Sequence, residues 1–135
     1  MSRSGYSDDC ENLNLWRANV DRSLAGRRGQ ALLHELIAAL DAMPEKRLIS
    51  QELRAEAGEV CALGAVGLKR GIDMKDLDPE CFEGVAKTFN IPTILAQEIF
   101  YQNDERNYRD TPEERWTSMR RWATDHLKQP ETAQA

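Results

Sequence analysis

The chain has 135 residues, of which 41% are hydrophobic and 30% charged, and its formal net charge is -5. This length suits one folded unit around a single core, and the composition is not that of a disordered chain. No apolar run approaches the roughly 18 residues that span a bilayer, and the acidic charge disfavours non-specific binding to nucleic acid.

The two ends of the sequence are polar. The first residues lack the apolar core of a secretory signal, so we expect a cytoplasmic protein. Residues 1–10 and 129–135 are predicted to be flexible ends of one helical domain that covers residues 11–128. The sequence contains three cysteines, Cys10, Cys61 and Cys81. This odd number without CxxC spacing indicates neither a disulfide framework nor a zinc cluster.

Apolar residues recur at helical spacing through the first third of the chain. One amphipathic helix is expected from about residue 11, with Gly26 closing it. A second helix carries the broadest apolar face, from Leu32 to Met43, and Pro44 cannot continue it. We expect this second helix to be the centre of the core.

The segment 48–60 allows two interpretations. Leu48 and Leu53 could extend a helix, or the segment could fold back through a turn and pair with Val60 and Cys61 as one short β-hairpin. Irregular or β structure is the favoured interpretation, and the hairpin stays open.

A helix rich in small residues is predicted from Cys61 to Gly71, with cations in its last turn and glycine as its cap. Gly64 and Gly67 each cost about 1 kcal/mol of helix stability relative to alanine. We therefore expect these two glycines to allow close packing against another helix.

Three proline-containing signals divide the second half of the chain into helices. Asp78-Pro79-Glu80 predicts an N-cap followed by proline in the first turn of a helix that runs to about Phe89. Pro92 ends that helix, and another is expected from about Thr93 to Asn103. Thr111-Pro112-Glu113-Glu114 predicts a capping box that starts the last helix. The predicted fold is mainly α, a single compact domain of five to six helices.

Residues 80–103 have the spacing of a helix-turn-helix. The small, turn and apolar positions of that motif are filled by Ala86, Asn90, Ile91, Leu95 and Ile99. A DNA-reading second helix carries cations and amides outward, yet residues 72–105 hold eight acids against two lysines, a local charge of -6. A DNA-binding regulator that places Arg17, Arg22, Arg27 and Arg28 on the DNA backbone is therefore the alternative function, and protein binding is the leading one.

The candidate protein-binding surface combines these acids with neighbouring aromatic residues, because such pairs make good anchors in interfaces. Its predicted members are Asp73, Asp76, Glu83, Glu98, Tyr101, Asp104, Glu105 and Trp122. Tyr108 and Trp116 belong to the same aromatic group, whose other interpretation is core with a partial rim. The acids could also be a solvated face or a nucleic-acid mimic, and these interpretations stay open.

Arg27 and Arg28 stand at the start of a helix, where cations oppose the helix dipole. One interpretation is an anion-binding site, in which the free amides of the helix start assist the two guanidinium groups. The other is internal pairing with Asp73, Asp76 or Glu83.

The residues that catalysis requires are sparse. His34 and His126 are the only histidines, and the sequence contains no metalloprotease, hydrolase or nucleotide-binding motif. Cys61 opens a helix, where a thiol could act as a nucleophile, but a cysteine in an apolar run is usually inert core. We therefore expect no enzyme, no catalytic or metal-binding residues and no cofactor.

Three stretches together suggest a relationship: residues 26–44 (GRRGQALLHELIAALDAMP), 58–67 (GEVCALGAVG) and 111–116 (TPEERW). They resemble a group of small proteins without assigned activity that are encoded by bacteria, prophages and phages, and the resemblance covers most of residues 16–127. It implies a small accessory protein that acts inside a bacterial cell. A phage inhibitor of host machinery is one concrete version of this expectation.

Overall fold

The computed structural model describes residues 13–106 and 109–128. In these residues the chain forms six α-helices and one π-helical turn. The elements are α1 (Leu13–Ala25), α2 (Arg27–Ala42), α3 (Ala62–Arg70), α4 (Phe82–Phe89), α5 (Thr93–Phe100), η1 (Tyr101–Glu105) and α6 (Pro112–Asp125). The prediction of a mainly α, single compact domain is confirmed. The predicted flexible ends, 1–10 and 129–135, lie outside the described residues.

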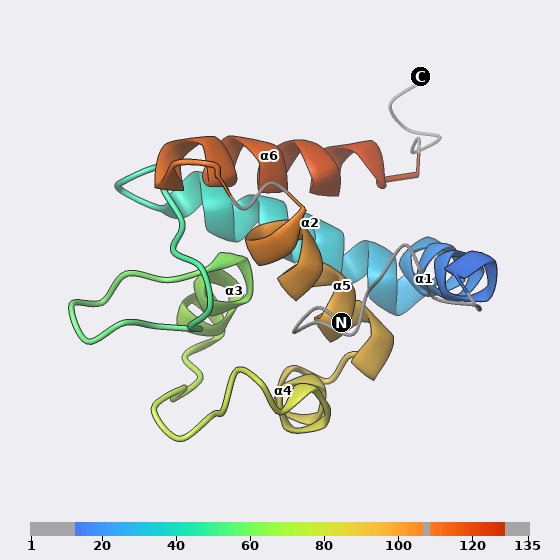
Figure 1. Ribbon diagram of the computed structural model, residues 1–135, viewed down its shortest axis with the longest axis horizontal. Helices are drawn as coiled ribbons and strands as arrows, with labels where there is room; N and C mark the ends of the chain where they lie inside the picture. The colour runs from blue at the N-terminus through green and yellow to red at the C-terminus, as the bar shows by residue number, and fades with distance from the viewer. Residues whose placement is uncertain (1–12, 107–108, 129–135) are drawn as a thin grey trace.

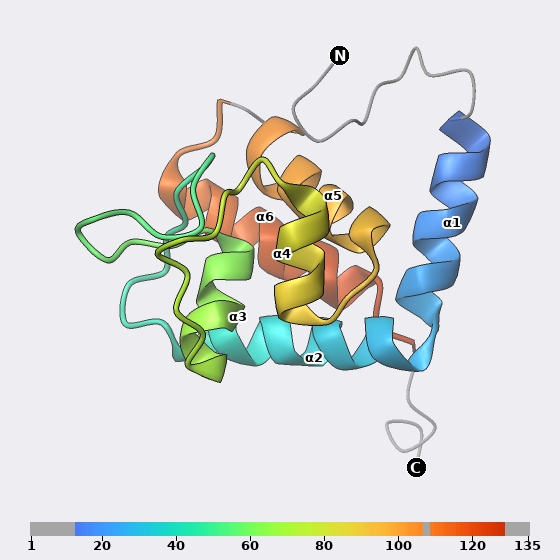
Figure 2. The same ribbon diagram turned by 90° about the horizontal axis from the view of Figure 1, so that it is seen from below.

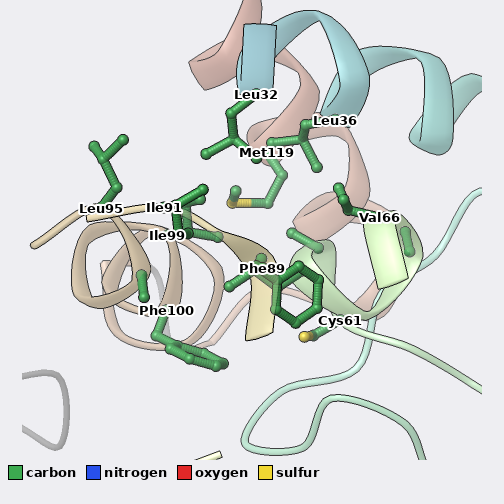
Figure 3. Packing of buried hydrophobic residues seen from close by; sticks show 14 of the residues in the cluster. Leu32, Leu36, Cys61, Val66, Phe89, Ile91, Leu95, Ile99, Phe100 and Met119 are labelled. Carbon is green, nitrogen blue, oxygen red and sulfur yellow. The ribbon is translucent and has the colours of Figure 1, made fainter. Parts of the chain in front are cut away.

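Helix α2 is the longest element and the centre of the core, as its apolar face predicts. It buries Leu32, Leu33, Leu36 and Leu40. Helix α6 lies antiparallel along α2 (Figure 1), and α1 stands at a steep angle to the start of α2 (Figure 2). Met119 of α6 lies between the leucines of α2 and the isoleucines of the α4–α5 region (Figure 3).

The sharp corner between α1 and α2 depends on Gly29. A Cβ atom on Gly29 would lie 2.0 Å from the carbonyl oxygen of Ser23, so the two helices meet at a distance that only glycine allows. Gln30 fixes the same corner, because its side-chain amide donates to the carbonyl oxygens of Leu24, at 2.8 Å, and His126, at 3.0 Å. One side chain thus ties the ends of α1 and α6 to the start of α2.

Residues 43–61 are irregular and fold back on themselves. The backbone N–H of Ile49 donates to the carbonyl oxygen of Val60 at 2.9 Å, and the N–H of Cys61 donates to the carbonyl oxygen of Leu53 at 3.3 Å. Arg54 and Val60 form an isolated antiparallel bridge, and no strand occurs in residues 13–106 or 109–128. The favoured irregular structure is confirmed, and the hairpin is reduced to this single bridge.

Helix α3 has the predicted boundaries, with Cys61 as N-cap and Gly71 as a left-handed C-cap at φ +73°. Its two internal glycines pack closely, and the predicted packing against a helix holds for Gly67 and not for Gly64. A Cβ on Gly64 would lie 1.9 Å from the carbonyl oxygen of Leu53, and one on Gly67 would lie 2.4 Å from the sulfur of Met74. Leu53 and Met74 belong to loops, which the helical spacing of the glycines does not reveal, whereas Phe89 of α4 lies 3.2 Å from the same Cβ position on Gly67.

The predicted start of α4 is wrong by a few residues. The Asp78 carboxylate accepts a hydrogen bond from the N–H of Glu80 at 2.9 Å, which closes an Asx turn. This turn keeps residues 78–81 out of the helix, so α4 begins at Phe82.

The predicted helix-turn-helix spacing is confirmed as a helical pair. Asn90 caps α4 in the left-handed conformation at φ 57°, and Pro92 is the N-cap of α5. Helix α5 then continues without a break into the π-helical turn η1. The capping box of Thr111 and Glu114 at the start of α6 is confirmed as well.

Candidate functional site

The predicted protein-binding surface does not form one face of the molecule, because three of its members are buried. Glu98 is 0% exposed, Asp104 9% and Trp122 4%. The prediction that these residues contact a partner is therefore wrong. Every residue of α5 is buried or half-buried, since the helix packs in the middle of the fold.

Glu98 serves the interior as a hydrogen-bond acceptor. One of its carboxylate oxygens is paired with Arg17 of α1, and the other accepts from the side-chain amide of Gln102 at 2.8 Å. A buried carboxylate requires such partners, because the burial of an unpaired ion costs on the order of several kcal/mol. Glu98 thus joins α1 to α5.

The buried polar groups of η1 hold the neighbouring loop. Asn103 accepts a hydrogen bond from the N–H of Ala62 at 3.1 Å and donates to the carbonyl oxygen of Ile49 at 3.0 Å. Asp104 accepts from the N–H of Gln51 at 3.1 Å, and Gln51 has a positive φ of 69°. The π-helical turn aims both side chains at residues 49–51 and at the start of α3.

The aromatic part of the predicted surface is largely core. Trp122 packs against His126, with ring centroids 5.1 Å apart. Tyr101 and Glu105 are half-buried, and Tyr108 lies outside the described residues. Trp116 is half-buried and donates to the carbonyl oxygen of Leu40 at 3.1 Å, so it holds α6 to α2.

The remaining acids, Asp73, Asp76 and Glu83, are exposed, as predicted. Asp73 and Asp76 belong to the loop after α3, which lies on the side of the molecule where the 48–60 segment also lies, far from α1 (Figures 1 and 2), and Glu83 belongs to α4. Between the two segments is a cleft of about 570 Å³, which we call the acidic cleft. It is lined by Glu52, Leu53, Arg54, Ala55, Glu56, Asp73, Met74, Lys75, Leu77 and Pro79.

The acidic cleft combines an apolar floor with a charged rim. Leu53 and Met74 are buried beneath it, and Leu77 is half-buried. Seven exposed acids lie on the two segments that border it, 52–56 and 73–83, against Arg54 and Lys75. Such a surface attracts cations to its rim and apolar groups to its floor.

Both walls of the cleft are fixed, by a hydrogen bond within one wall and by contacts of both walls with the rest of the fold. On the 73–79 wall, the Asp73 carboxylate accepts from the N–H of Lys75 at 3.0 Å, and Met74 packs against the bare backbone of Gly67. The 52–56 wall rests on Gly64 through Leu53, and η1 holds the residues before it. A wall that is already ordered loses less entropy on binding.

Glu52 and Glu56 are site residues that the sequence analysis missed. The signal was present, because charged and apolar residues alternate from Glu52 to Glu56, as in an extended chain with one buried side. What was absent was any indication that this segment lies beside residues 73–79, which are about twenty positions away.

Arg27 and Arg28 are both exposed at the start of α2. In residues 13–106 and 109–128 neither forms an ion pair with Asp73, Asp76 or Glu83, so the predicted internal pairing is wrong. Arg28 instead donates to the side-chain oxygen of Asn90 at 3.0 Å, which links α2 to the turn between α4 and α5. Anion binding by these arginines stays a prediction.

The described residues bring together no recognisable catalytic group. The Cys61 side chain is buried and accepts a capping hydrogen bond from the N–H of Gly64 at 3.4 Å. In residues 13–106 and 109–128 no three histidine, cysteine or acidic side chains are placed to hold a metal ion. No helix in these ranges is long and apolar enough to cross a membrane.

Two ion pairs between helices shift the pKa values of their members, and neither pair lines the cleft. Hydrogen bonding to Arg120 lowers the pKa of Asp41, and the pairing raises that of Arg120. Hydrogen bonding to Glu35 raises the pKa of Arg70. These shifts report on how helices are joined and not on reaction chemistry.

Comparison with protein-family models, curated proteins and solved structures finds no match to this chain.

Proposed function

We propose that this protein is a small non-enzymatic accessory protein that binds another protein through the acidic cleft. The observation that carries the proposal is the cleft itself, which lies between two ordered loops and joins an apolar floor to a rim with excess negative charge. The partner surface that fits the acidic cleft is basic. Opposite charges on two proteins accelerate their association, whereas like charges slow it.

The setting of this activity is proposed from the resemblance to small bacterial, prophage and phage proteins. We propose a bacterial cytoplasm as its compartment and a host or phage protein as its partner. Inhibition of host machinery is the concrete version, since occupying a basic surface blocks whatever else binds there.

The DNA-binding alternative has less support. A recognition helix must present one face to the major groove, whereas α5 has no exposed residue and Glu98 on it is paired with Arg17. Only Arg22, Arg27 and Arg28 of the four arginines assigned to DNA are exposed. We expect no mobility shift with genomic fragments at about 50 mM salt, where phosphate contacts are strong.

The experiment is quantitative capture of proteins from bacterial lysate with the wild-type chain and a charge-reversed variant, Glu52→Lys/Glu56→Lys. A partner of the cleft is retained by the wild type and lost with the variant. With the purified partner, the Kd should rise by about tenfold or more, because like charges across an interface cost several kcal/mol.

The matched control is Asp21→Lys/Asp125→Lys, which makes the same change in net charge at exposed positions on α1 and α6. It should bind the partner as the wild type does. Equal binding by the wild type and the cleft variant, or equal loss with both variants, would contradict the proposal.

A further inference from the structure

We infer that the acidic cleft recognises a short segment of the partner chain in which one large apolar side chain is flanked by lysine or arginine. This inference rests on the proposed function and specifies the chemistry of the partner. It follows from the size of the cleft, its floor and its rim.

The size of the cleft favours a short segment. A volume of about 570 Å³ lies within the range of roughly 300–1,000 Å³ that is typical of sites for small ligands. It suits one large side chain and the backbone next to it. The rest of the partner surface would contribute weaker contacts around this anchor, as in other interfaces with a central hot spot.

The floor of the cleft selects an apolar side chain. Leu53 is 3% exposed and Met74 6%, and Leu77 and Pro79 offer half-buried apolar surface beside them. A polar side chain placed there would lose hydrogen bonds to water without replacing them. Leucine, methionine or an aromatic residue would cover the floor and exclude water.

The rim selects cations on both sides of that anchor. Glu52 and Glu56 stand on one wall with Arg54 between them, and Asp73 stands on the other wall with Lys75. Asp76, Asp78 and Glu80 extend the acidic rim beyond Asp73. Lysine or arginine residues before and after the anchor would therefore meet carboxylates, whereas acidic residues at those positions would be repelled.

The test uses fluorescein-labelled synthetic peptides and anisotropy at physiological salt. The parent peptide has a central leucine between pairs of lysines, one derivative replaces the leucine with serine, and another replaces the lysines with glutamates. The parent should bind, the serine peptide about tenfold or more weaker because an apolar contact is lost, and the glutamate peptide not at all.

Two protein variants separate the anchor from the charges. Leu77→Ser should weaken binding of the parent peptide about tenfold and leave binding of the serine peptide unchanged. The reason is that Leu77 and the central leucine of the peptide contact each other, so removing either one removes the same interaction. Glu52→Gln/Glu56→Gln should weaken the parent and the serine peptide alike. Asp21→Asn/Asp125→Asn, with the same change in net charge, should bind all peptides as the wild type does.

Equal binding of the parent and serine peptides, or equal binding to the glutamine variant and its control, would overturn the inference. So would failure of every peptide to bind. These outcomes are distinct from failure of the proposed function, which is judged by whether a captured partner is lost with the charge-reversed variant.

Discussion

Single residues set how closely the backbone segments of this fold approach one another. Gly29 and Gly64 each leave room for a carbonyl oxygen where a Cβ atom would stand, at 2.0 Å and 1.9 Å. Gly71 is needed for a different reason, its positive φ of 73°. The role of a glycine thus depends on its neighbour or its dihedral angle, not on its helical position alone.

Replacement of Gly29 tests the corner between α1 and α2. Gly29→Ala should lower the free energy of unfolding by about 2 kcal/mol or more, because the added methyl group overlaps backbone atoms that cannot move cheaply. Gly26→Ala is the control, since its Cβ would lie 3.7 Å from the nearest atoms, and it should cost under about 1 kcal/mol. Urea titration gives both values, and equal losses would argue against the steric account.

Elements of this fold are joined by polar side chains that reach from one to the next. Arg70 of α3 pairs with Glu35 of α2 and also donates to the carbonyl oxygen of Phe89 at the end of α4. Arg120 of α6 pairs with Asp41 near the end of α2. In the π-helical turn, Asn103 and Asp104 likewise form hydrogen bonds to the backbone of residues 49–51.

Replacement of Asn103 tests whether η1 supports the acidic cleft. Asn103→Ala leaves the N–H of Ala62 and the carbonyl oxygen of Ile49 without their side-chain partner, at a cost of about 1–3 kcal/mol. Amide hydrogen exchange in residues 48–61 should accelerate. Arg106→Ala, at an exposed position just after η1, should change stability by under about 0.5 kcal/mol and leave that exchange unchanged.

The pair between α2 and α6 predicts a pH dependence. Arg120 holds the pKa of Asp41 below its ordinary 3.8. Because the folded-state pKa is lowered, the stabilisation is present above that ordinary value and is lost as the pH falls through the lowered pKa. The stability difference between wild type and Asp41→Asn should therefore stay the same above about pH 5 and narrow as the pH falls to 3.8 and below, as measured by thermal unfolding. A constant difference would show that the pair contributes nothing to acid sensitivity.

At the scale of the whole molecule, one core connects helices from both ends of the described chain. Val20 of α1, Leu36 of α2 and Met119 of α6 belong to the same buried cluster. The two loops that border the acidic cleft lie at the end of the molecule away from α1 (Figure 2).

A single core predicts a single cooperative unfolding transition. In a Trp116→Phe/Trp122→Phe variant the remaining tryptophan, Trp16, reports on α1, while circular dichroism reports on all helices. The two signals should change at the same urea concentration. An earlier midpoint for Trp16 fluorescence would show that α1 unfolds separately from the rest.

Much of the helical architecture follows from the sequence alone, because local physics decides it. The apolar face of α2, the capping box at Thr111 and the glycine cap at Gly71 act within a few residues of the chain, so their helix boundaries are predictable. The start of α4 was missed because the Asp78 side chain closes a turn, a choice that competes locally with the helix N-cap.

Only the tertiary structure decided which charges are available for binding. Glu98 and Asp104 have the same chemistry in the sequence as Asp73 and Asp76, but α5 and η1 lie in the interior, where a carboxylate is stabilised by partners from distant segments. Glu52 and Glu56 join the site because two loops meet across α3. The spacing of apolar residues along the chain predicts where helices form. Which side chains are buried, and which loops lie side by side, depends on contacts between residues far apart in the chain.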